Sequence, residues 1–562
     1  MTEPTTLAAM TFAAMWDASV RSRGNEVFLR FEASDATVHE WTYDEFDRVV
    51  AHTAGRLTDA GVDAERGVHL ALTNSPSFVA AWLAAIRLGS WIVPSDPMAT
   101  APELAEHLRR TRPAVSVVAM SRQGVSAEAS ATAGDDVRDL VTIPVDEDDV
   151  TLDALTTNEG RPSVPVVIPP AIDPTDRAAV MFTSGTTGRP KGVVVTQANY
   201  AFAGTTMAAA ADLGPNDRQL VVLPMFHANA QYYSFASAIA VGASVPLMHT
   251  FSASRFVAQA ARHGATHASL FAGPLRMILA RGGPWTPEGT EPPLALRHCW
   301  FAQNITNDQY ETLTDWFGCR PRQLYGMTET IPAVLTDEPV APRPSSMGFV
   351  TTGCTVALQD ADGAPTPVGE VGEIVVGGTP GHTLFAGYLD DPDTTAASFR
   401  DGWFVTGDRA RVDADGRFSF DGRRSDVLKV SGENVSVVEV EAVIGEHPDV
   451  FDVVVVGAPD PIRDEVPVAY VVAAPGAGDT LVDDLGEWCA ERLAKAKRPR
   501  RVILVDELPR TSVGKVRKFL LTEAASRSDG DTPHSKPGVD PVDTNTDPDS
   551  LQPSAHPEEN RT

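Results

Sequence analysis

The sequence predicts an α/β protein in which a large N-terminal domain is followed by a small C-terminal α/β domain. The chain has 562 residues, more than one hydrophobic core usually supports, so at least two domains are expected. Apolar runs bounded by loop residues alternate with helix-like stretches, which indicates parallel sheets covered by helices. Toward the end of the large domain, short apolar runs lie closer together, which indicates an antiparallel subdomain. The fold class is therefore α/β, with two layered α/β subdomains and a β-barrel-like subdomain in the large domain.

Taken in chain order, the apolar runs predict the elements of the large domain. Residues 67–72, "GVHLAL", are typical of a buried strand, and residues 75–89 predict a helix because the stretch starts at Ser-Pro and stops at Gly. Further strands are expected at 90–94, 178–182, 220–224 and 267–271, and a helix at 199–214. The strand-dense, antiparallel part is expected around 372–378, "GEIVVGG", and 416–422, "GRFSFDG".

A domain boundary is expected at "DGRRSD", residues 421–426, where a smaller unit begins. This unit reads as a helix over 435–450, strands at 452–458 and 468–474, and a helix through 485–494. We divide the chain into an N-terminal domain (1–421), a hinge (422–426), a C-terminal domain (427–525) and a tail (526–562). The tail is rich in Asp, Pro, Ser and Thr without aromatic residues, so we expect it to be disordered.

Composition excludes several classes of partner. The formal net charge of −29 argues against nucleic acid or an anionic membrane surface, because both demand clustered Lys and Arg. The four cysteines form no CxxC pair, so a disulfide framework or a cysteine metal site is not expected. The N-terminus lacks a basic signal region, and no apolar run is long enough to span a bilayer. A cytoplasmic location is expected.

The stretch "MFTSGTTGRPKGVVVT", residues 181–196, places three glycines and a lysine between two apolar runs. It is not the strand–loop–helix phosphate loop GxxxxGK[ST], because Lys191 is followed by glycine and the stretch runs into a second strand. Glycines let the backbone approach an oxyanion, hydroxyls donate hydrogen bonds and lysine supplies charge, so a polyphosphate is the natural ligand. Taken by itself, such a loop could equally be a mobile surface turn.

Four strings in order resemble the signatures of the adenylate-forming superfamily, which includes acyl-CoA ligases, luciferase-like enzymes and the adenylation domains of peptide synthetases. They are "TSGTTGRPKG" (183–192), "YGMTET" (325–330), "WFVTGDRARVDADGRFSFDGRRSD" (403–426) and "RTSVGKVRK" (510–518). The resemblance implies that a carboxylate and ATP form an acyl-adenylate, and that a thiol then displaces AMP to give a thioester. It implies ATP/AMP, magnesium and CoA as ligands. It also implies that 1–421 is an AMP-binding domain and that the small domain is mobile.

The resemblance assigns roles to residues of the large domain. The phosphate loop would hold the β- and γ-phosphates of ATP through Thr183, Ser184, Gly185, Thr186, Thr187 and Lys191. In the second signature, Tyr325 beside Gly326 would stack on adenine, Thr328 would touch the α-phosphate, and Glu329 would hold magnesium, which suits a carboxylate plus phosphate oxygens. In the third, Asp408 would accept both ribose hydroxyls, and Arg423 would approach the ribose or a phosphate.

The same resemblance assigns roles in the hinge and the small domain. Lys515 would bond the substrate carboxylate and the α-phosphate region. After the hinge turns, the "KVSGENVS" loop with Lys429, Gly432 and Glu433 would face the incoming thiol. Arg498, in a basic segment, could meet CoA phosphates or form a solvated face. Ser425 stands at the hinge where the family usually has Asp or Lys.

The expected acyl pocket departs from the commonest pattern. Most acyl-CoA ligases carry a Gly-Gly-Ala-Pro-like strand end before the second signature, whereas "HCWFAQNI" places Trp300, Phe301 and Gln303 there. This string and "PMFHANAQYY" resemble the crotonobetaine/carnitine-CoA ligase branch. His227 in the second string would lie where the acyl pocket meets the thiol tunnel, and we count it with Lys515 and Glu329 as catalytic.

The predicted function is that of an ATP-dependent, AMP-forming acyl-CoA ligase whose partners are a small carboxylic acid and CoA, with homodimer formation left open. One alternative is an adenylating enzyme that loads a free carrier protein, since the chain holds no carrier attachment signature of its own. Another is an enzyme that runs mainly the thioester-forming half-reaction. A third is a binding protein that has lost ATP-driven chemistry. The presence of Lys191, Glu329 and Lys515 argues against this third alternative.

Overall fold

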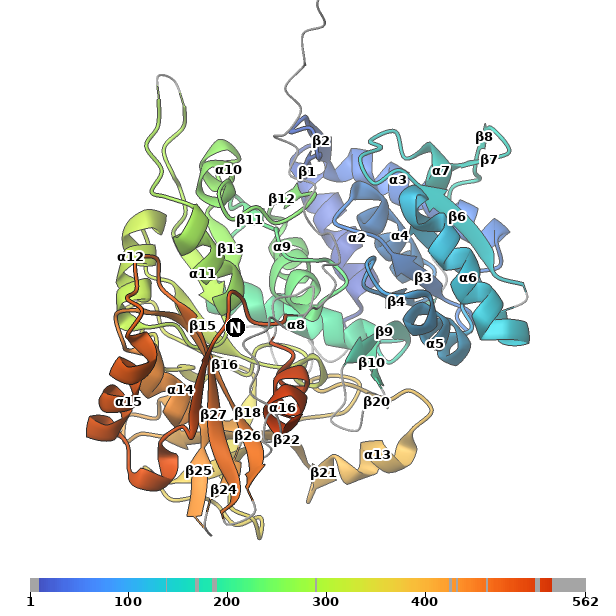
Figure 1. Cartoon of the computed structure of the whole chain (residues 1–562). Coiled ribbons are helices and arrows are strands. Elements are labelled where there is room, and N and C mark those ends of the chain that lie inside the picture. Colours follow the sequence, from blue (N-terminus) through green and yellow to red (C-terminus); the bar gives the residue numbers. More distant parts are fainter. Residues whose placement is uncertain are drawn as a thin grey trace, which may run out of the picture.

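The chain folds as an α/β protein with a large N-terminal part and a small C-terminal part, as the sequence predicts (Figure 1). In Figure 1 the orange and red C-terminal part lies beside the green and yellow segments and away from the blue ones. The computed structural model describes residues 10–137, 139–166, 171–183, 190–288, 291–423, 427–430, 433–460, 463–510 and 516–527.

A seven-stranded sheet forms the first layer, in the order β20-β10-β9-β4-β3-β5-β6. Its central strands are parallel, and β10 runs antiparallel to both β9 and β20. The strands are β3 (Val68–Ala71), β4 (Ile92–Pro94), β5 (Val115–Ala119), β6 (Val141–Val145), β9 (Arg177–Thr183), β10 (Lys191–Thr196) and β20 (Gly387–Tyr388). The strands expected at 67–72, 90–94 and 178–182 are confirmed within a residue or two at their ends.

A six-stranded sheet forms the second layer, in the order β11-β13-β14-β15-β16-β17. It is parallel from β11 to β15 and antiparallel beyond. Its strands are β11 (Gln219–Leu220), β13 (His267–Ser269), β14 (His298–Phe301), β15 (Arg322–Tyr325), β16 (Leu335–Thr336) and β17 (Phe349–Val350). A three-stranded sheet of β1 (Val27–Glu32), β2 (Val38–Thr42) and β12 (Val245–Met248) and a hairpin of β7 (Thr157–Asn158) and β8 (Arg161–Pro162) complete this half.

Helices cover these sheets, and their ends follow local capping signals. Helix α4 begins after Ser75, whose hydroxyl accepts from the Phe78 N–H, and it carries Pro76 at its first position. All its residues are buried, as expected for a helix that is apolar on every side. The helices are α2 (Phe12–Arg23), α3 (Tyr43–Asp59), α4 (Pro76–Arg87), α5 (Ala101–Thr111), α6 (Gln123–Ala133), α7 (Asp153–Thr156), α8 (Gln197–Ala211), α9 (Ala236–Val241), α10 (Phe256–Arg262), α11 (Ala272–Arg281) and α12 (Asn307–Phe317).

The strand-dense region forms a five-stranded antiparallel sheet, in which β18, β19, β22 and β21 follow one another and β23 pairs with β22. Its elements are β18 (Thr355–Gln359), β19 (Val371–Gly377), α13 (Pro392–Ala397), β21 (Phe399–Arg400), β22 (Trp403–Val412) and β23 (Phe418–Arg423). Strand β23 extends two residues past position 421, so pairing with β22 continues into the segment expected to be the hinge.

The C-terminal part is built on a second five-stranded sheet, with helices packed on both faces. Its elements are β24 (Val427–Val430), β25 (Glu433–Ser436), α14 (Val437–Gly445), β26 (Val450–Asp460), β27 (Asp464–Ala473), α15 (Leu481–Arg492), β28 (Arg501–Leu504) and α16 (Lys518–Arg527). Helix α16 includes the first two residues of the expected tail, 526 and 527. Residues 528–562, the rest of that tail, lie outside the described residues. Within the described part of the chain, every helix is too short or too polar to cross a bilayer.

Candidate functional site

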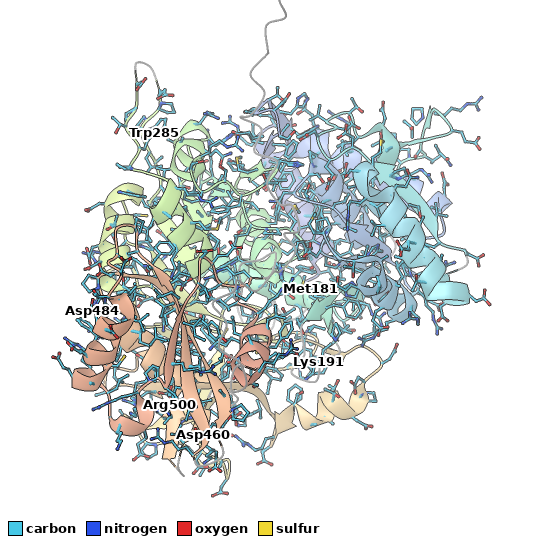
Figure 2. The ribbon with its side chains drawn as sticks, viewed as in Figure 1. Met181, Lys191, Trp285, Asp460, Asp484 and Arg500 are labelled. Carbon is cyan, nitrogen blue, oxygen red and sulfur yellow. The ribbon has the colours of Figure 1, made fainter. Side chains whose placement is uncertain are left out.

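The glycine-rich stretch joins two antiparallel strands, β9 and β10, which lie next to each other in the sheet. Thr183, the last residue of β9, pairs with Lys191, the first residue of β10. Figure 2 labels Met181 and Lys191 on these two strands. The antiparallel pairing confirms that the loop does not lead into a helix. The expected phosphate ligands Ser184, Gly185, Thr186 and Thr187 lie outside the described residues.

The base of this hairpin is held by helix α5. The ring of Phe182 on β9 stacks on His107 with centroids 4.0 Å apart and planes at 5°, and the guanidinium of Arg110 lies 5.0 Å from the centroid of the same ring. Arg110 also donates hydrogen bonds to the Pro190 carbonyl (2.6 Å) and the Leu389 carbonyl (3.4 Å). Burial lowers the pKa of His107 to about 4, so its ring is neutral near pH 7. Both ends of the loop are therefore anchored by one helix.

Lys191 and Glu329 lie on either side of one tyrosine, Tyr388 of β20. The Lys191 ammonium is 4.7 Å from the centroid of the Tyr388 ring, a cation–π contact. The Tyr388 hydroxyl donates to Glu329 Oε1 at 3.1 Å, and Glu329 is 4% exposed. Burial, followed by the Glu329 charge, raises the pKa of Tyr388, so its hydroxyl keeps its proton. The structure thus brings the expected phosphate-binding lysine and the expected metal-binding carboxylate to the same place.

A second set joins Tyr325, Asp408 and Arg423. The Tyr325 hydroxyl donates to Asp408 Oδ2 at 2.7 Å, and Arg423 Nε donates to Asp408 Oδ1 at 3.0 Å. Asp408 on β22 and Arg423 on β23 are register partners, whereas Tyr325 ends β15 of the other sheet. Burial raises the pKa of Tyr325 well above its usual range. Three residues that the sequence assigns to adenine and ribose binding therefore form one hydrogen-bonded set.

The turn between Tyr325 and Pro332 is tightly constrained. A Cβ on Gly326 would lie 2.8 Å from the Tyr233 hydroxyl and 2.9 Å from the Pro332 carbonyl, so this position requires glycine. Thr328 and Glu329 occupy a 3₁₀ turn, with Thr328 half-buried. Ile331 follows with φ 72° and ψ −73°, a conformation that a β-branched residue adopts only under strain. Packing around a fully buried Ile331 holds the turn that presents Glu329.

The residues expected at the acyl pocket do not all share one face. Trp300 and Phe301 are neighbours on β14, so their side chains point to opposite faces, and they pack in different hydrophobic clusters. Phe301 lies in the core beside Tyr310, with ring centroids 6.3 Å apart. The Trp300 ring is covered by the guanidinium of Arg322 at 4.7 Å. The expectation that both rings line one wall fails because strand alternation separates them.

Gln303 and Asn304 are the two exposed members of that string, and the backbone of Gln303 has φ 72°. The amide nitrogen of Gln323, on β15, donates to the Gln303 carbonyl (3.0 Å), to Asn304 Oδ1 (3.2 Å) and to the Pro344 carbonyl (3.1 Å). Gln323 is 2% exposed, so a buried amide holds the strained segment 303–304 in place. We call residues 303–304 the acyl wall, after the pocket wall that the sequence analysis expects there.

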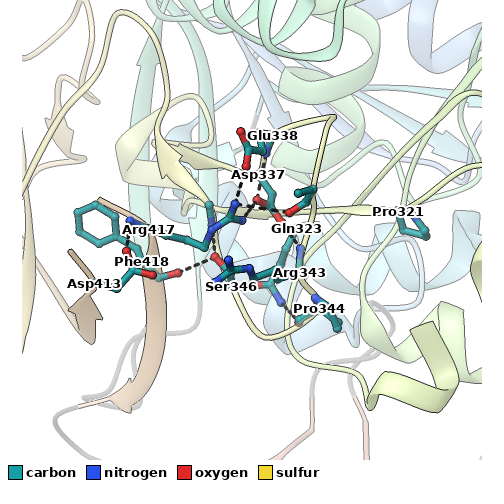
Figure 3. A network of polar contacts seen from close by, with 12 residues as sticks. Pro321, Gln323, Asp337, Glu338, Arg343, Pro344, Ser346, Asp413, Arg417 and Phe418 are labelled. Carbon is teal, nitrogen blue, oxygen red and sulfur yellow. Dashed lines mark hydrogen bonds and ion pairs between the residues drawn. The ribbon is translucent and has the colours of Figure 1, made fainter. Parts of the chain in front are cut away.

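Figure 3 shows the network behind Gln323. Arg417 is buried and pairs with Asp337 (2.5 Å) and Glu338 (2.6 Å), and Asp337 Oδ2 accepts from the Arg343 N–H at 2.8 Å. These bonds tie the loop before Pro344 to the antiparallel sheet. The acyl wall is thus supported through Gln323 by a buried ion pair.

His227 lies half-buried between β11 and a π-helix, Asn229–Phe235. Its ring contacts Phe226 at 4.5 Å between centroids, and its carbonyl accepts from the Gln231 N–H at 3.4 Å. Short π-helical turns are rare and are frequently found at functional sites. The π-helix also supplies Tyr233, whose hydroxyl faces Gly326.

The small domain shows fewer of its expected site residues. Arg498 donates to the Leu493 and Ala490 carbonyls, both at 2.9 Å, so it caps the end of α15. Lys429 is exposed on β24, and its N–H donates to Glu465 Oε2 at 2.8 Å. Ser425, Gly432 and Lys515 lie outside the described residues, as does the side chain of Glu433.

The site includes residues that the sequence analysis did not single out: Tyr388, Arg110 and Gln323. Tyr388 reaches Lys191 because β20 pairs with β10 across almost two hundred residues of chain, at Val193 and Tyr388. No local spacing reveals such a pairing. Gln323 lies two residues before Tyr325 on the same strand. Its position next to the "YGMTET" signature was the one sequence feature that could have indicated a role for it.

The described residues contain no group of three or more His, Cys, Asp or Glu side chains arranged to hold a metal. A lone buried carboxylate such as Glu329 nevertheless fits Mg²⁺, which commonly takes one or two carboxylates and fills its other positions with phosphate oxygens and water. A metal at Glu329 would therefore need phosphate oxygens and water as its other ligands.

Comparisons with known proteins agree with this geometry. The family model of the AMP-binding enzyme matches residues 16–389, and that of the AMP-binding enzyme C-terminal domain matches residues 439–515. A crotonobetaine/carnitine–CoA ligase of Salmonella arizonae is 33% identical over 512 residues, which are 90% of this chain and 97% of that protein.

Two solved structures extend the comparison. A benzoate CoA ligase from Burkholderia xenovorans has a TM-score of 0.80 at 23% identity, over 91% of this chain and 99% of its own, a likeness of fold alone. The o-succinylbenzoate CoA synthetase of Bacillus subtilis, in complex with its acyl-adenylate intermediate, has a TM-score of 0.76 at 25% identity, over 90% of this chain and 97% of its own.

Proposed function

This chain belongs to the AMP-binding enzyme family, and on that basis we propose that it is an ATP-dependent acid–thiol ligase, an AMP-forming acyl-CoA ligase. In the first half-reaction, a carboxylate oxygen attacks the α-phosphorus of ATP, and the bond to the β-phosphate breaks to release pyrophosphate. In the second, the CoA sulfur attacks the acyl carbonyl carbon, AMP leaves, and the thiol proton passes to solvent. The enzyme would work in the cytoplasm on a small carboxylic acid.

The observation that carries the proposal is the Lys191–Tyr388–Glu329 series. A cation 4.7 Å from an aromatic ring, whose hydroxyl is 3.1 Å from a buried carboxylate, places opposite charges at a fixed separation. A polyphosphate with a bound cation has the complementary charges. Lys191 would bind phosphate oxygens, and Tyr388 would hold Glu329 in one rotamer. Magnesium bound at Glu329 would supply charge stabilisation for the transferring phosphoryl group.

Asp408 would bind the ribose of the same nucleotide. Its oxygens accept from Tyr325 and Arg423, and each carboxylate oxygen has two lone pairs. One acceptor position on each oxygen is therefore available in principle to a ribose hydroxyl. The Tyr325 ring would lie along the adenine. No side-chain nucleophile is required, because the substrate carboxylate performs the attack.

The second half-reaction rests on His227 and the small domain. His227 would lie between acyl group and thiol, at the start of the π-helix. We propose that the small domain turns about residues 422–426 between the steps, removes Lys515 and brings the 429–433 segment to the thiol. Arg498 already bonds two carbonyl oxygens, so a CoA phosphate would have to share its guanidinium.

A screen of carboxylic acids tests the activity itself. Native protein, ATP and magnesium are incubated with each acid, and pyrophosphate release and the mass of the CoA thioester are measured. Carnitine, crotonobetaine and benzoate belong in the panel because similar proteins are CoA ligases for these acids. Release of pyrophosphate that depends on an acid, followed by a thioester of matching mass, is expected.

Lys515→Ala separates the two half-reactions. It should abolish acyl-adenylate formation and leave conversion of a supplied acyl-adenylate to thioester largely intact, since the lysine would be away from the site in that step. Arg527→Ala, which removes an exposed arginine from the last helix of the same domain, is the control and should change neither. Equal losses for Lys515→Ala in both assays would remove the assignment.

A further inference from the structure

An ion pair joins the large domain to the small domain. Arg276, on α11 of the large domain, places an Nη1 nitrogen 2.9 Å from Asp452 Oδ1, on β26 of the small domain. The Asp452 side chain is 7% exposed and that of Arg276 is 22% exposed, so the pair is shielded from solvent. Shielded charge pairs are screened by salt less than surface pairs. The contact therefore persists at physiological salt better than a surface pair would.

Asp452 also holds the start of the segment that carries Lys515. Its second oxygen, Oδ2, pairs with Arg510. Arg510 forms an antiparallel bridge with Val516, so these two residues bracket that segment. Arg510 and Asp452 belong to the same domain and move together, whereas Arg276 belongs to the other. The turn of the small domain proposed above would therefore break the Arg276 contact and keep the Arg510 contact.

Because Asp452 has one arginine partner in each domain, the contact between the domains is reversible. Breaking an ion pair is costly when it leaves a buried charge without a partner. Asp452 keeps Arg510 in both orientations, so opening the domain contact leaves no orphaned carboxylate. A pair built in this way can stabilise one orientation without locking it.

Arg276 also touches the acyl wall. Its Nη2 nitrogen donates to the Asn304 carbonyl at 2.9 Å. The same segment is held from the other side by Gln323, whose amide contacts Gln303 and Asn304. One guanidinium therefore contacts both the small domain and the wall of the expected acyl pocket.

We propose that Arg276 and Asp452 are positioning residues that hold the small domain in the adenylate-forming orientation and couple that orientation to the acyl wall. The proposal rests on the acyl-CoA ligase function proposed above. In the orientation described here, Asp452 links Arg510, which precedes the Lys515 segment, to Arg276 of the large domain. An acid that orders residues 303–304 also orders Arg276, and so favours the orientation in which the acid is adenylated. Such coupling requires an element with two states that both sites influence. Here that element is the orientation of the small domain, and the two sites are the acyl wall and the Arg276–Asp452 contact.

Arg276→Gln tests the proposal, because it removes the large-domain partner and leaves Asp452 paired with Arg510. Pyrophosphate release should fall about five-fold, the lower end of typical coupling between sites. Conversion of supplied acyl-adenylate with CoA should stay unchanged or rise. Arg281→Gln, which removes an exposed arginine at the end of the same helix, is the matched control and should change neither half-reaction.

Asp452→Asn provides the second arm and the sharper readout. It should shift the ratio of the two half-reactions as Arg276→Gln does, and the double variant should shift it no further than either single one. It should also raise the KM for the acid, although Asp452 is linked to the acyl wall only through Arg276. An unchanged acid KM in Asp452→Asn would overturn the coupling, and additive shifts in the double variant would overturn the pairing.

The outcomes separate this proposal from the function on which it rests. If the native protein releases no pyrophosphate with any acid, the ligase function fails. If the native protein turns over and Arg276→Gln loses both half-reactions equally, only the positioning role fails. Thermal unfolding of each variant shows whether an equal loss reflects a damaged fold.

Discussion

Two aspartates in this molecule each bind an arginine, but they serve different purposes. Asp408 joins Tyr325 and Arg423 through bonds of 2.7 and 3.0 Å, between two sheets of the large part. Asp452 joins Arg276 of the large domain to Arg510 of the small domain. The first set joins strands of the large domain, so we expect its geometry to be fixed before a ligand arrives. The second joins units that we propose to separate between the two half-reactions. The comparison therefore predicts a preorganised nucleotide side and an adjustable domain contact.

Glu329→Gln should have the largest effect, because it removes a negative charge from the fixed part of the site. Acyl-adenylate formation is expected to fall about 10²–10³-fold, the usual cost of losing one preorganised electrostatic contact. Raising the magnesium concentration should restore part of the rate. Glu370→Gln, at an exposed position, is the control. A rate within a factor of three of native would show that Glu329 holds no catalytic cation.

Acid should weaken the large domain through its buried histidines. Burial lowers the pKa of His107 to about 4 and that of His69 to about 3, against about 6.5 when unfolded. The unfolded chain therefore binds more protons below pH 6.5, and the free energy of unfolding falls as the pH drops toward 4. At pH 5, each histidine should cost about 2 kcal/mol relative to pH 7.

Urea unfolding of native protein and His107→Gln at pH 7 and pH 5 measures this effect. The variant should lose less stability between the two pH values than the native chain. Equal losses would mean that His107 is protonated in the folded state. The stacking of His107 on Phe182 makes this a test of the hairpin base as well.

Tyr325→Phe should remove one of the two hydrogen bonds to the Asp408 carboxylate and leave the bond from Arg423. The lost bond is to a charged group, worth about 1.5 kcal/mol, so the KM for ATP should rise about ten-fold. Tyr310→Phe removes a buried hydroxyl that donates to the Pro321 carbonyl at 2.9 Å, away from the site, and serves as the control. The acid KM should stay as it is. Equal KM changes in the two variants would indicate general loosening.

Ser425→Asp should have the smallest effect. It changes the expected hinge, and so acts on the orientation of the small domain. The family usually has Asp or Lys at this position, and an aspartate could bond differently in the two orientations. We expect it to speed adenylation relative to thioester formation by about five-fold, for a bias of about 1 kcal/mol. Both half-reactions are measured in the native protein and the variant. An unchanged ratio, with both rates measurable, would contradict the role of Ser425.

Local sequence signals were enough for much of the fold, and they marked the residues that we propose for the nucleotide site. Alternating apolar runs predicted the strands near 67–72 and 178–182 and the helix near 199–214, because periodicity and capping depend on neighbouring residues. The motif strings marked Lys191, Tyr325 and Asp408 in the same way. Phosphate and ribose are bound by backbone turns and by side chains close to them, so a short string carries most of that chemistry.

Tertiary structure alone decided which distant residues meet. Tyr388 lies between Lys191 and Glu329 because β20 pairs with β10, and Arg276 reaches Asp452 because two domains pack together. Trp300 and Phe301 are adjacent in sequence and yet separated, because a strand sends neighbours to opposite faces. The physical reason is the same in each case. Long-range contacts depend on how sheets pair and pack, and the residues that make them need no particular spacing along the chain.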